Sequence, residues 1–180
     1  MTGMEAQAAA QDEVDHVRAA QAGDESAFAA LYSRYARVVH GILLARLPAS
    51  EVDDLVQEIF LTAWRKLKSL REPAAFPGWL AAIARNRATD HMRRSVPEDP
   101  LEDRFEAAGA MAGERAEARR ALRAIQALPD AYRETLTLRL VEGLTGPEIA
   151  ERTGLAHGSV RVNLHRGMQM LREALGKEAR

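Results

Sequence analysis

The stretch TGPEIAERTGLAHGSVRVNLHRGMQML, residues 145–171, has the pattern of two helices joined by a tight glycine turn. Thr145 and Glu148 have the T-x-x-E spacing of a capping box, and Pro147 falls in the first turn of the helix that follows. Gly154 stands where the turn needs a left-handed backbone conformation. Together these signals predict a helix-turn-helix.

The second helix of this pair has two distinct faces. Its apolar face, at i, i+4 and i+7 spacing, consists of Val160, Leu164, Leu171 and Leu175. A second face carries Arg161, Val162, His165 and Arg166. Arginine can bond guanine in the major groove and an apolar side chain can contact a thymine methyl, so this face suits DNA recognition. The alternative is a helical hairpin whose charged face is simply solvated.

The rest of the sequence also has helical periodicity, and no strand pattern persists. Apolar residues recur from Asp24 to Leu47, where Pro48 ends the helix. Ser50, with Asp53 three residues later, is a plausible N-cap of a second helix that runs to about Leu67. A loop with two prolines follows. A third helix, over residues 78–94, buries Trp79 and its apolar neighbours.

The composition then changes to an acidic segment rich in Pro and Gly, which is typical of a linker. Helical pattern resumes near Glu114, Pro129 opens a further helix and Gly143 closes it. We therefore expect an all-α protein of two small helical domains joined by a flexible linker. The expected boundaries are a disordered N-terminus at 1–14, a first domain at 15–95, a linker at 96–113 and a second domain at 114–180.

Composition excludes several classes of protein. The chain has 180 residues, no cysteine and a net charge of −1, so disulfides and cysteine-ligated metal sites are ruled out. The N-terminal residues lack the layout of a signal peptide, and apolar runs are too short to span a bilayer. We expect a cytoplasmic protein without membrane insertion. Because the net charge is near zero, any nucleic-acid binding needs segregated charge.

The helix expected after Pro48 is apolar over too wide an arc for one core. Asp54, Gln57 and Glu58 form an acidic stripe, and Phe60 and Leu61 point beside it. An acidic stripe next to exposed apolar residues suggests a surface that docks on a protein. The alternative is a central helix that is buried on both sides.

The third helix is basic. It contains Arg85, Arg87, Arg93 and Arg94 against a single acid, Asp90. Such a surface suits phosphates, and the amide of Asn86 could bond a base edge. The preceding loop, residues 68–75, would accompany this helix. The alternative is a solvated basic face, and Trp79 is better explained as core than as a platform for base stacking.

Three stretches in this order resemble the extracytoplasmic-function sigma factors of the bacterial sigma-70 family. They are DDLVQEIFLTAW, FPGWLAAIARNRATDHMRR and LPDAYRETLTLRLVEGLTGPEIAERTGLAHGSVRVNLHRGMQMLRE. The resemblance runs from about Asp24 to Leu175, apart from the linker. It implies a first domain like sigma domain 2 and a second like sigma domain 4. It also implies an alternative sigma factor that binds core RNA polymerase, reads the −10 and −35 promoter elements and helps to melt DNA.

The resemblance assigns residues to each of these tasks. Docking on the β′ clamp of polymerase falls to Asp53, Asp54, Gln57, Glu58, Phe60 and Leu61. The −10 element falls to Lys68, Arg71, Arg85, Asn86, Arg87, Asp90, Arg93 and Arg94. The −35 element falls to Arg139, Ser159, Arg161, Val162, His165 and Arg166. The family often has basic residues at the positions of Asn163 and Met168, so fewer phosphate contacts are expected here.

The expected partners are core polymerase, through its β′ clamp and β flap, promoter DNA, and an anti-sigma factor that could hold the protein at the membrane. No cofactor, metal or small-molecule substrate is expected. A different class of function is a stand-alone helix-turn-helix regulator that binds operator DNA unaided. An enzyme is not expected, because the five histidines lack metal-site spacing and no phosphate-binding glycine loop is present.

Overall fold

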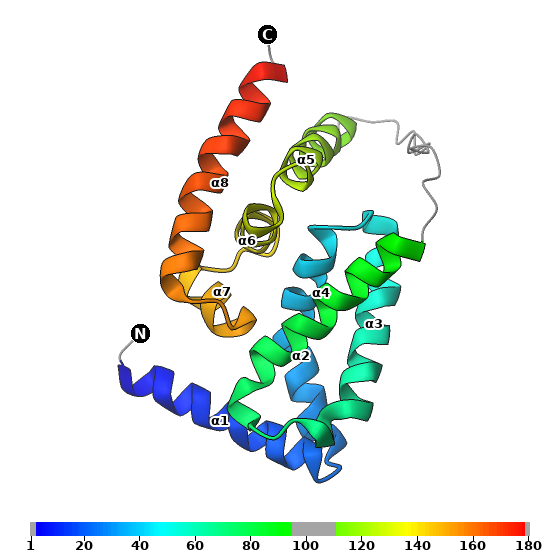
Figure 1. Ribbon diagram of the computed structural model, residues 1–180, viewed down its shortest axis with the longest axis vertical. Coiled ribbons are helices and arrows are strands. Elements are labelled where there is room, and N and C mark those ends of the chain that lie inside the picture. Colours follow the sequence, from blue (N-terminus) through cyan, green and yellow to red (C-terminus); the bar gives the residue numbers. More distant parts are fainter. Residues whose placement is uncertain (1–2, 95–110, 179–180) are drawn as a thin grey trace.

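The computed structural model describes residues 3–94 and 111–178, and every regular element in these two ranges is a helix (Figure 1). The first range holds α1 (Gly3–Gln21), α2 (Glu25–Leu44), α3 (Ala49–Lys66), η1 (Leu67–Ser69), η2 (Pro73–Ala75) and α4 (Phe76–Arg94). The second range holds α5 (Met111–Gln126), α6 (Asp130–Leu140), α7 (Gly146–Thr153) and α8 (His157–Glu178). The predicted all-α architecture of two helical domains is confirmed.

The N-terminal boundary differs from the expectation. Residues 3–14, expected to be disordered, belong to α1. Alanine, glutamine and glutamate favour helix, and α1 is anchored where Glu13 accepts a hydrogen bond from the Tyr35 hydroxyl and pairs with Arg34 at 3.3 Å. Burial and this hydrogen bond to Glu13 raise the pKa of Tyr35, so its hydroxyl remains a donor. Composition alone could not reveal this long-range anchor.

Two further boundaries differ in detail. Helix α3 starts at Ala49 after Pro48, and no side chain caps it, so Ser50 lies inside the first turn instead of at the N-cap. The expected linker at 96–113 lies outside the described residues except for its last three, 111–113, which belong to α5. Pro129 precedes α6 as its N-cap residue, close to where the sequence placed the start of that helix.

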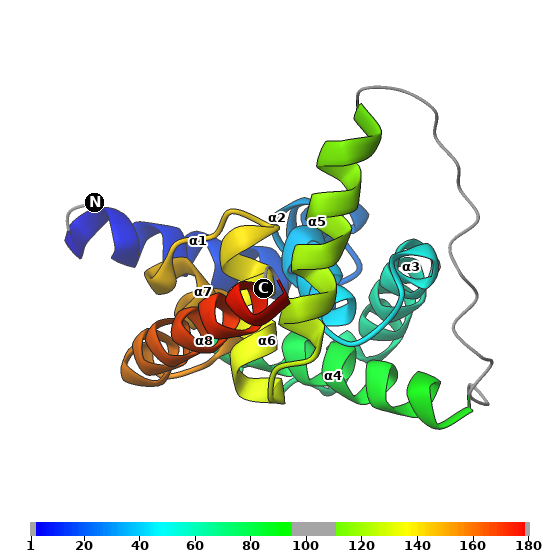
Figure 2. The same ribbon diagram turned by 90° about the horizontal axis from the view of Figure 1, so that it is seen from above.

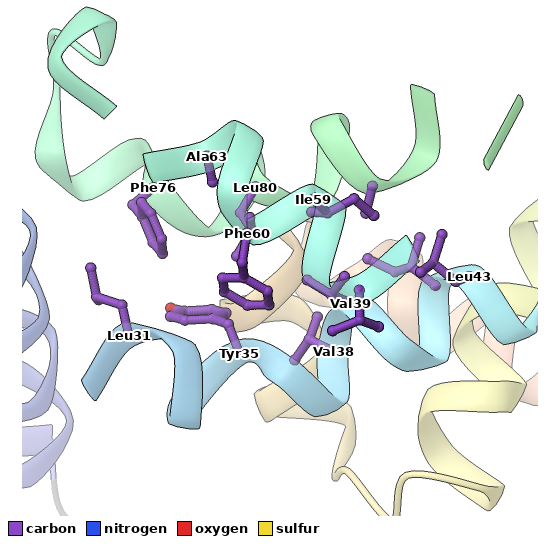
Figure 3. Packing of buried hydrophobic residues seen from close by; sticks show 14 of the residues in the cluster. Leu31, Tyr35, Val38, Val39, Leu43, Ile59, Phe60, Ala63, Phe76 and Leu80 are labelled. Carbon is purple, nitrogen blue, oxygen red and sulfur yellow. The ribbon is translucent and has the colours of Figure 1, made fainter. Parts of the chain in front are cut away.

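The core of the first domain lies between α2, α3 and α4 (Figure 3). Tyr35 of α2 is fully buried, and its ring meets Phe76 at the start of α4 edge-on at 5.4 Å. Trp79 is half-buried and packs on the same cluster, as expected of a core residue. The interlocked helices give α3 and α4 a fixed mutual placement, on which both candidate surfaces of this domain depend.

The second domain packs against the first instead of standing apart. Helix α6 contacts α2, and α7 contacts α4 (Figures 1 and 2). Leu138, Ile149 and Val160 of the second domain belong to the same continuous apolar cluster as α2, α3 and α4. A smaller cluster around Leu136 and Leu171 is confined to the second domain. The two domains thus share one core across their boundary.

Two glycines lie in close contact with the other domain. A Cβ added to Gly41 of α2 would lie 2.7 Å from a methyl of Leu138 in α6. Gly154, at φ 72°, forms the turn between α7 and α8, and a Cβ there would lie 2.9 Å from the Cα of Gly78. At Gly154 the neighbour is backbone and φ is positive, so this position needs glycine, whereas a side chain at Gly41 would require Leu138 and Glu142 to shift.

The helix-turn-helix begins with the predicted capping box. The Thr145 hydroxyl accepts from the Glu148 backbone N–H, and Glu148 accepts from the Thr145 backbone N–H at 2.8 Å. Hydrogen bonds from the backbone N–H and hydroxyl of Thr145 hold the pKa of Glu148 below its ordinary value. The cap that the sequence predicted is thus present with both of its reciprocal bonds.

Replacing Thr145 should weaken this helix start. Thr145→Ala removes the acceptor for the Glu148 N–H and should cost about 1 kcal/mol of unfolding free energy. Thr145→Ser keeps the hydroxyl and serves as the control. Urea denaturation followed by circular dichroism measures the difference, and equal midpoints for all three proteins would contradict the role of the cap.

A second expectation concerns His40 of α2, which lies at the boundary between the domains. Its hydrogen bond to Glu142, with Nδ1 and Oε1 2.6 Å apart, raises the pKa of His40 despite partial burial, and Asp53 adds to this rise. Arg37 of the same helix also contacts Glu142. Because the pKa of His40 is raised in the folded protein, the contact contributes its full stabilisation below pH 6.5, the ordinary pKa of histidine. That stabilisation is lost as the pH rises through the raised pKa.

The comparison of wild type with His40→Gln tests this expectation. Glutamine does not titrate in this pH range. The difference in unfolding free energy between wild type and the variant should therefore be largest at about pH 6 and smallest at about pH 9. Urea titrations at several pH values measure that difference. A difference that is constant with pH would show that His40 does not titrate against Glu142.

Candidate nucleic-acid and protein-docking surfaces

Helix α8 presents the predicted recognition face to solvent. Val160 and Leu171 are buried, and Leu164 packs against both apolar clusters. On the other side all four predicted readers are exposed, with Val162 42% accessible. The readers are Arg161, Val162, His165 and Arg166. The apolar face therefore fixes the rotation of α8 and leaves the reading face open.

The neighbouring elements hold α8 in place. Gly167 of α8 is buried against Leu136 and Tyr132 of α6, where an added Cβ would meet side-chain atoms at 3.1–3.2 Å. Ser159, in the first turn of α8, is exposed. Arg139, at the end of α6, is also exposed, and its Nη1 donates to the Leu144 carbonyl at 3.2 Å. All six residues assigned to the −35 element thus lie on the surface of the second domain.

The residues predicted to form the basic face of α4 fall into two groups, those that are exposed and those that are held in ion pairs. Asn86, Asp90, Arg93 and Arg94 are exposed and follow one another at helical spacing on one side of α4. Lys68 of η1 and Arg71 of the next turn are exposed as well. The amide and the four cationic side chains among these six residues remain available to a polyanion, with the carboxylate of Asp90 between them.

Two of the arginines assigned to the −10 element form ion pairs with glutamates of other helices, although they were expected to be open to solvent. Arg85 donates to both carboxylate oxygens of Glu134 in α6, and its Nη2–Oε1 distance is 2.8 Å. Arg87 donates from Nε to Glu58 in α3 at 3.1 Å. The sequence could not indicate either pair, because their partners lie 49 and 29 residues away.

Helix α3 carries an exposed acidic stripe beside a groove. Asp53, Asp54, Gln57 and Glu58 are exposed, and Leu61 is 55% accessible. Helix α3 is therefore not buried on both sides. Phe60, expected on the surface, is only 3% accessible, because its ring packs against Tyr32 at 4.5 Å and Phe28 at 6.3 Å.

The groove next to this stripe was not predicted. It has a volume of about 390 Å³, and Phe60 forms part of its lining with Phe28, Tyr32, Leu61 and Trp64. Its polar rim comes from Glu25 and Gln57. A signal was present in the sequence: Phe28 with Tyr32, and Phe60 with Trp64, are both aromatic pairs at i, i+4. The surface combines acidic groups with accessible aromatic area, a combination found at protein interfaces.

The described residues offer neither a metal site nor a membrane span. In residues 3–94 and 111–178, no three histidine, aspartate or glutamate side chains come together in a way that could hold a metal ion. In the same ranges no helix is both long and apolar enough to cross a bilayer.

Comparison with known proteins explains this combination of surfaces. The family described as Sigma-70 region 2 matches residues 31–96, and the family described as Sigma-70, region 4 matches residues 118–171. The ECF RNA polymerase sigma-E factor of Escherichia coli strain K12 is 33% identical, covering 86% of this chain and 90% of its own. That of Haemophilus influenzae is also 33% identical, with the same coverage.

The chain belongs to the ECF sigma factors of the sigma-70 family. It is an alternative sigma factor, and the stand-alone regulator is not favoured because relatives match across both domains. The fold also resembles CnrH, solved in complex with the cytosolic domain of CnrY, with a TM-score of 0.65 at 24% identity. That likeness covers 92% of this chain and 98% of CnrH.

The exposed recognition face of this sigma factor leads to a specific expectation. Arg161→Ala should cost about 1–3 kcal/mol and relax the preference at one base pair of the −35 element, if Arg161 contacts a base edge. Arg123 of α5 is exposed and carries no promoter assignment, so Arg123→Ala is the matched control. Holoenzyme binding to promoters with single base-pair changes measures the preference. An equal loss on every promoter would instead identify Arg161 as a phosphate contact.

Proposed function

We propose that three surfaces of this sigma factor divide the work of promoter opening. The acidic stripe and groove of α3 and α2 dock on the β′ clamp of core RNA polymerase. The exposed face of α4 with Lys68 and Arg71 takes the −10 element. The exposed face of α8 with Arg139 and Ser159 takes the −35 element, while the second domain also contacts the β flap. The match of sigma-E relatives across 86% of the chain is the observation that carries this proposal.

The charge distribution supports this division. The chain has a net charge of only −1, although DNA is a polyanion that favours cationic proteins. Placing the acids on the α3 stripe leaves the faces of α4 and α8 basic. The free protein should therefore bind promoter DNA weakly, and polymerase should supply the remaining positive surface and hold the two reading helices at the required distance.

Melting requires a further contribution from the first domain. Opening a base step loses stacking, and an unstacked base held on the protein regains about 1–3 kcal/mol. We place this base near Asn86 and the loop before α4, where an amide can bond a base edge. No bond is made or broken in these steps, so the protein acts by binding and not as an enzyme.

Regulation is proposed at the same docking surface. An anti-sigma factor that covers the groove lined by Phe28, Tyr32 and Trp64 would compete directly with polymerase. CnrH, which is similar in fold, was solved in complex with another protein, the cytosolic domain of CnrY. The protein would act in the cytoplasm, and a membrane-bound anti-sigma factor would hold it at the membrane until release.

Charge reversal on α3 tests the docking surface. Asp54→Lys with Glu58→Lys should reduce binding to core polymerase at least 100-fold, because the basic surface facing an acidic stripe would then be repelled. Asp12→Lys with Asp15→Lys makes the same change of net charge on exposed positions of α1 and serves as the control. Co-purification and run-off transcription with sigma-free core polymerase report the result, and circular dichroism checks the fold. Unchanged co-purification of the α3 variant would overturn the assignment.

A further inference from the structure

The last residue of α1 is hydrogen-bonded to the segment that joins α3 to α4. The side chain of Gln21 donates from Nε2 to the carbonyl of Leu67 at 3.0 Å and to the carbonyl of Leu70 at 2.7 Å. These two residues lie 46 and 49 positions further along the chain. An amide nitrogen carries two N–H donors, so one side chain can satisfy both carbonyls. Gln21 thereby joins α1 to a loop that is remote from it in sequence.

The two carbonyls belong to the turn η1, which follows the end of α3. Carbonyls at the end of a helix have no donor in a following turn, and Gln21 supplies one here. The side chains of Leu67 and Leu70 are buried in the core of the first domain. Because both hydrogen bonds are partly buried, removal of their donor is unfavourable. The backbone of η1 is therefore held from one side by the core and from the other by Gln21.

The rest of α1 is fixed to the first domain as well. Val17 and Ala20 are buried in its core, and Glu13 accepts a hydrogen bond from Tyr35 of α2. These α1 residues and Gln21 follow one another at helical spacing and share one face of α1. Helix α1 contacts both η1 and η2, the two short turns between α3 and α4 (Figure 1). Gln21 thus connects the loop to a helix that is itself anchored.

The turn that Gln21 holds carries two cations assigned to the −10 element. Lys68 directly follows Leu67, Arg71 directly follows Leu70, and both cations are exposed. Each carbonyl that accepts from Gln21 is therefore part of the peptide group that leads into one of these cations. Because a peptide group is planar, fixing its carbonyl also fixes the Cα of the next residue. The two hydrogen bonds of Gln21 thus determine where both cations leave the backbone.

We propose that Gln21 is a positioning residue for the −10 element, which holds Lys68 and Arg71 in place before DNA arrives. This inference rests on the proposed −10 role of the loop before α4. A loop that is already in its binding conformation loses less conformational entropy on binding, so it binds the opened strand more tightly than a loop that is free to move. Gln21 acts through the two cations and does not itself need to touch DNA.

Gln21→Met is the variant that removes this tie. Methionine keeps the length of the side chain and favours helix about as strongly as glutamine, but it has no N–H donor. Gln11→Met is the matched control, because Gln11 is exposed on the same helix and donates to Asp15, one turn away. Circular dichroism checks that both variants keep the helical content of wild type.

Two DNA probes separate positioning from a general loss of stability. The first is a single-stranded oligonucleotide from the non-template strand of a promoter that the wild-type holoenzyme transcribes, and it carries the −10 element alone. The second is a duplex with the −35 element of the same promoter. Gln21→Met holoenzyme should bind the single strand on the order of 10-fold more weakly than wild type. Its affinities for the duplex and for core polymerase should be unchanged, and Gln11→Met should match wild type throughout.

Hydrogen exchange of the free chain gives a readout that needs no DNA. Peptides that cover residues 67–75 should exchange on the order of 10-fold faster in Gln21→Met than in wild type, because the turn has lost its donor. Peptides from α2 should keep their exchange rates. Mass spectrometry measures both sets of peptides in one experiment.

The outcomes distinguish the role of Gln21 from the sigma function. Equal exchange of residues 67–75 in Gln21→Met and wild type would overturn the positioning role, even where run-off transcription succeeds. An unchanged affinity for the single strand would also overturn it, and so would an equal loss of affinity for both probes, which indicates general destabilisation. Failure of the wild-type holoenzyme to bind either probe or to initiate transcription would instead overturn the proposed function, while hydrogen exchange would still report whether Gln21 holds the loop.

Discussion

The arrangement of this protein depends on one buried charge, the carboxylate of Glu134, and on the arginines that neutralise it. Arg46 follows α2 and Arg85 belongs to α4, so a single side chain of α6 is bonded to two elements of the other domain. Desolvating a carboxylate costs several kcal/mol unless its partners have good geometry, and these partners bond both oxygens. One helical turn further along α6, Leu138 makes the apolar contact with Gly41 of α2. These directional contacts therefore fix how the second domain is oriented on the first.

The parts of the fold that local sequence determines were predicted well. The capping box of Thr145 and Glu148, the left-handed Gly154 and the two faces of α8 all follow from residues within one or two helical turns of each other. In each case the deciding interaction lies within the helix that carries the pattern.

The differences arise where a distant residue decides. Phe60 looks like a surface residue until Phe28 and Tyr32 of α2 enclose its ring. Arg85 and Arg87 look like phosphate ligands until Glu134 and Glu58 are seen beside them. The residues before Asp15 look disordered because their anchor, the Glu13–Tyr35 bond, spans 22 positions. Neither periodicity nor composition encodes such pairs. The sequence therefore indicated the chemical character of each surface, but not which of its residues are exposed and unpaired in the fold.

The near-neutral net charge of the chain and the Glu134–Arg85 pair both limit binding of DNA by the free protein. A sigma factor that bound DNA by itself would be held on the genome, where non-specific sites are far more numerous than promoters. A net charge of −1 keeps the counterion-release contribution of the free chain small, and the Glu134–Arg85 pair removes one guanidinium from the phosphate surface.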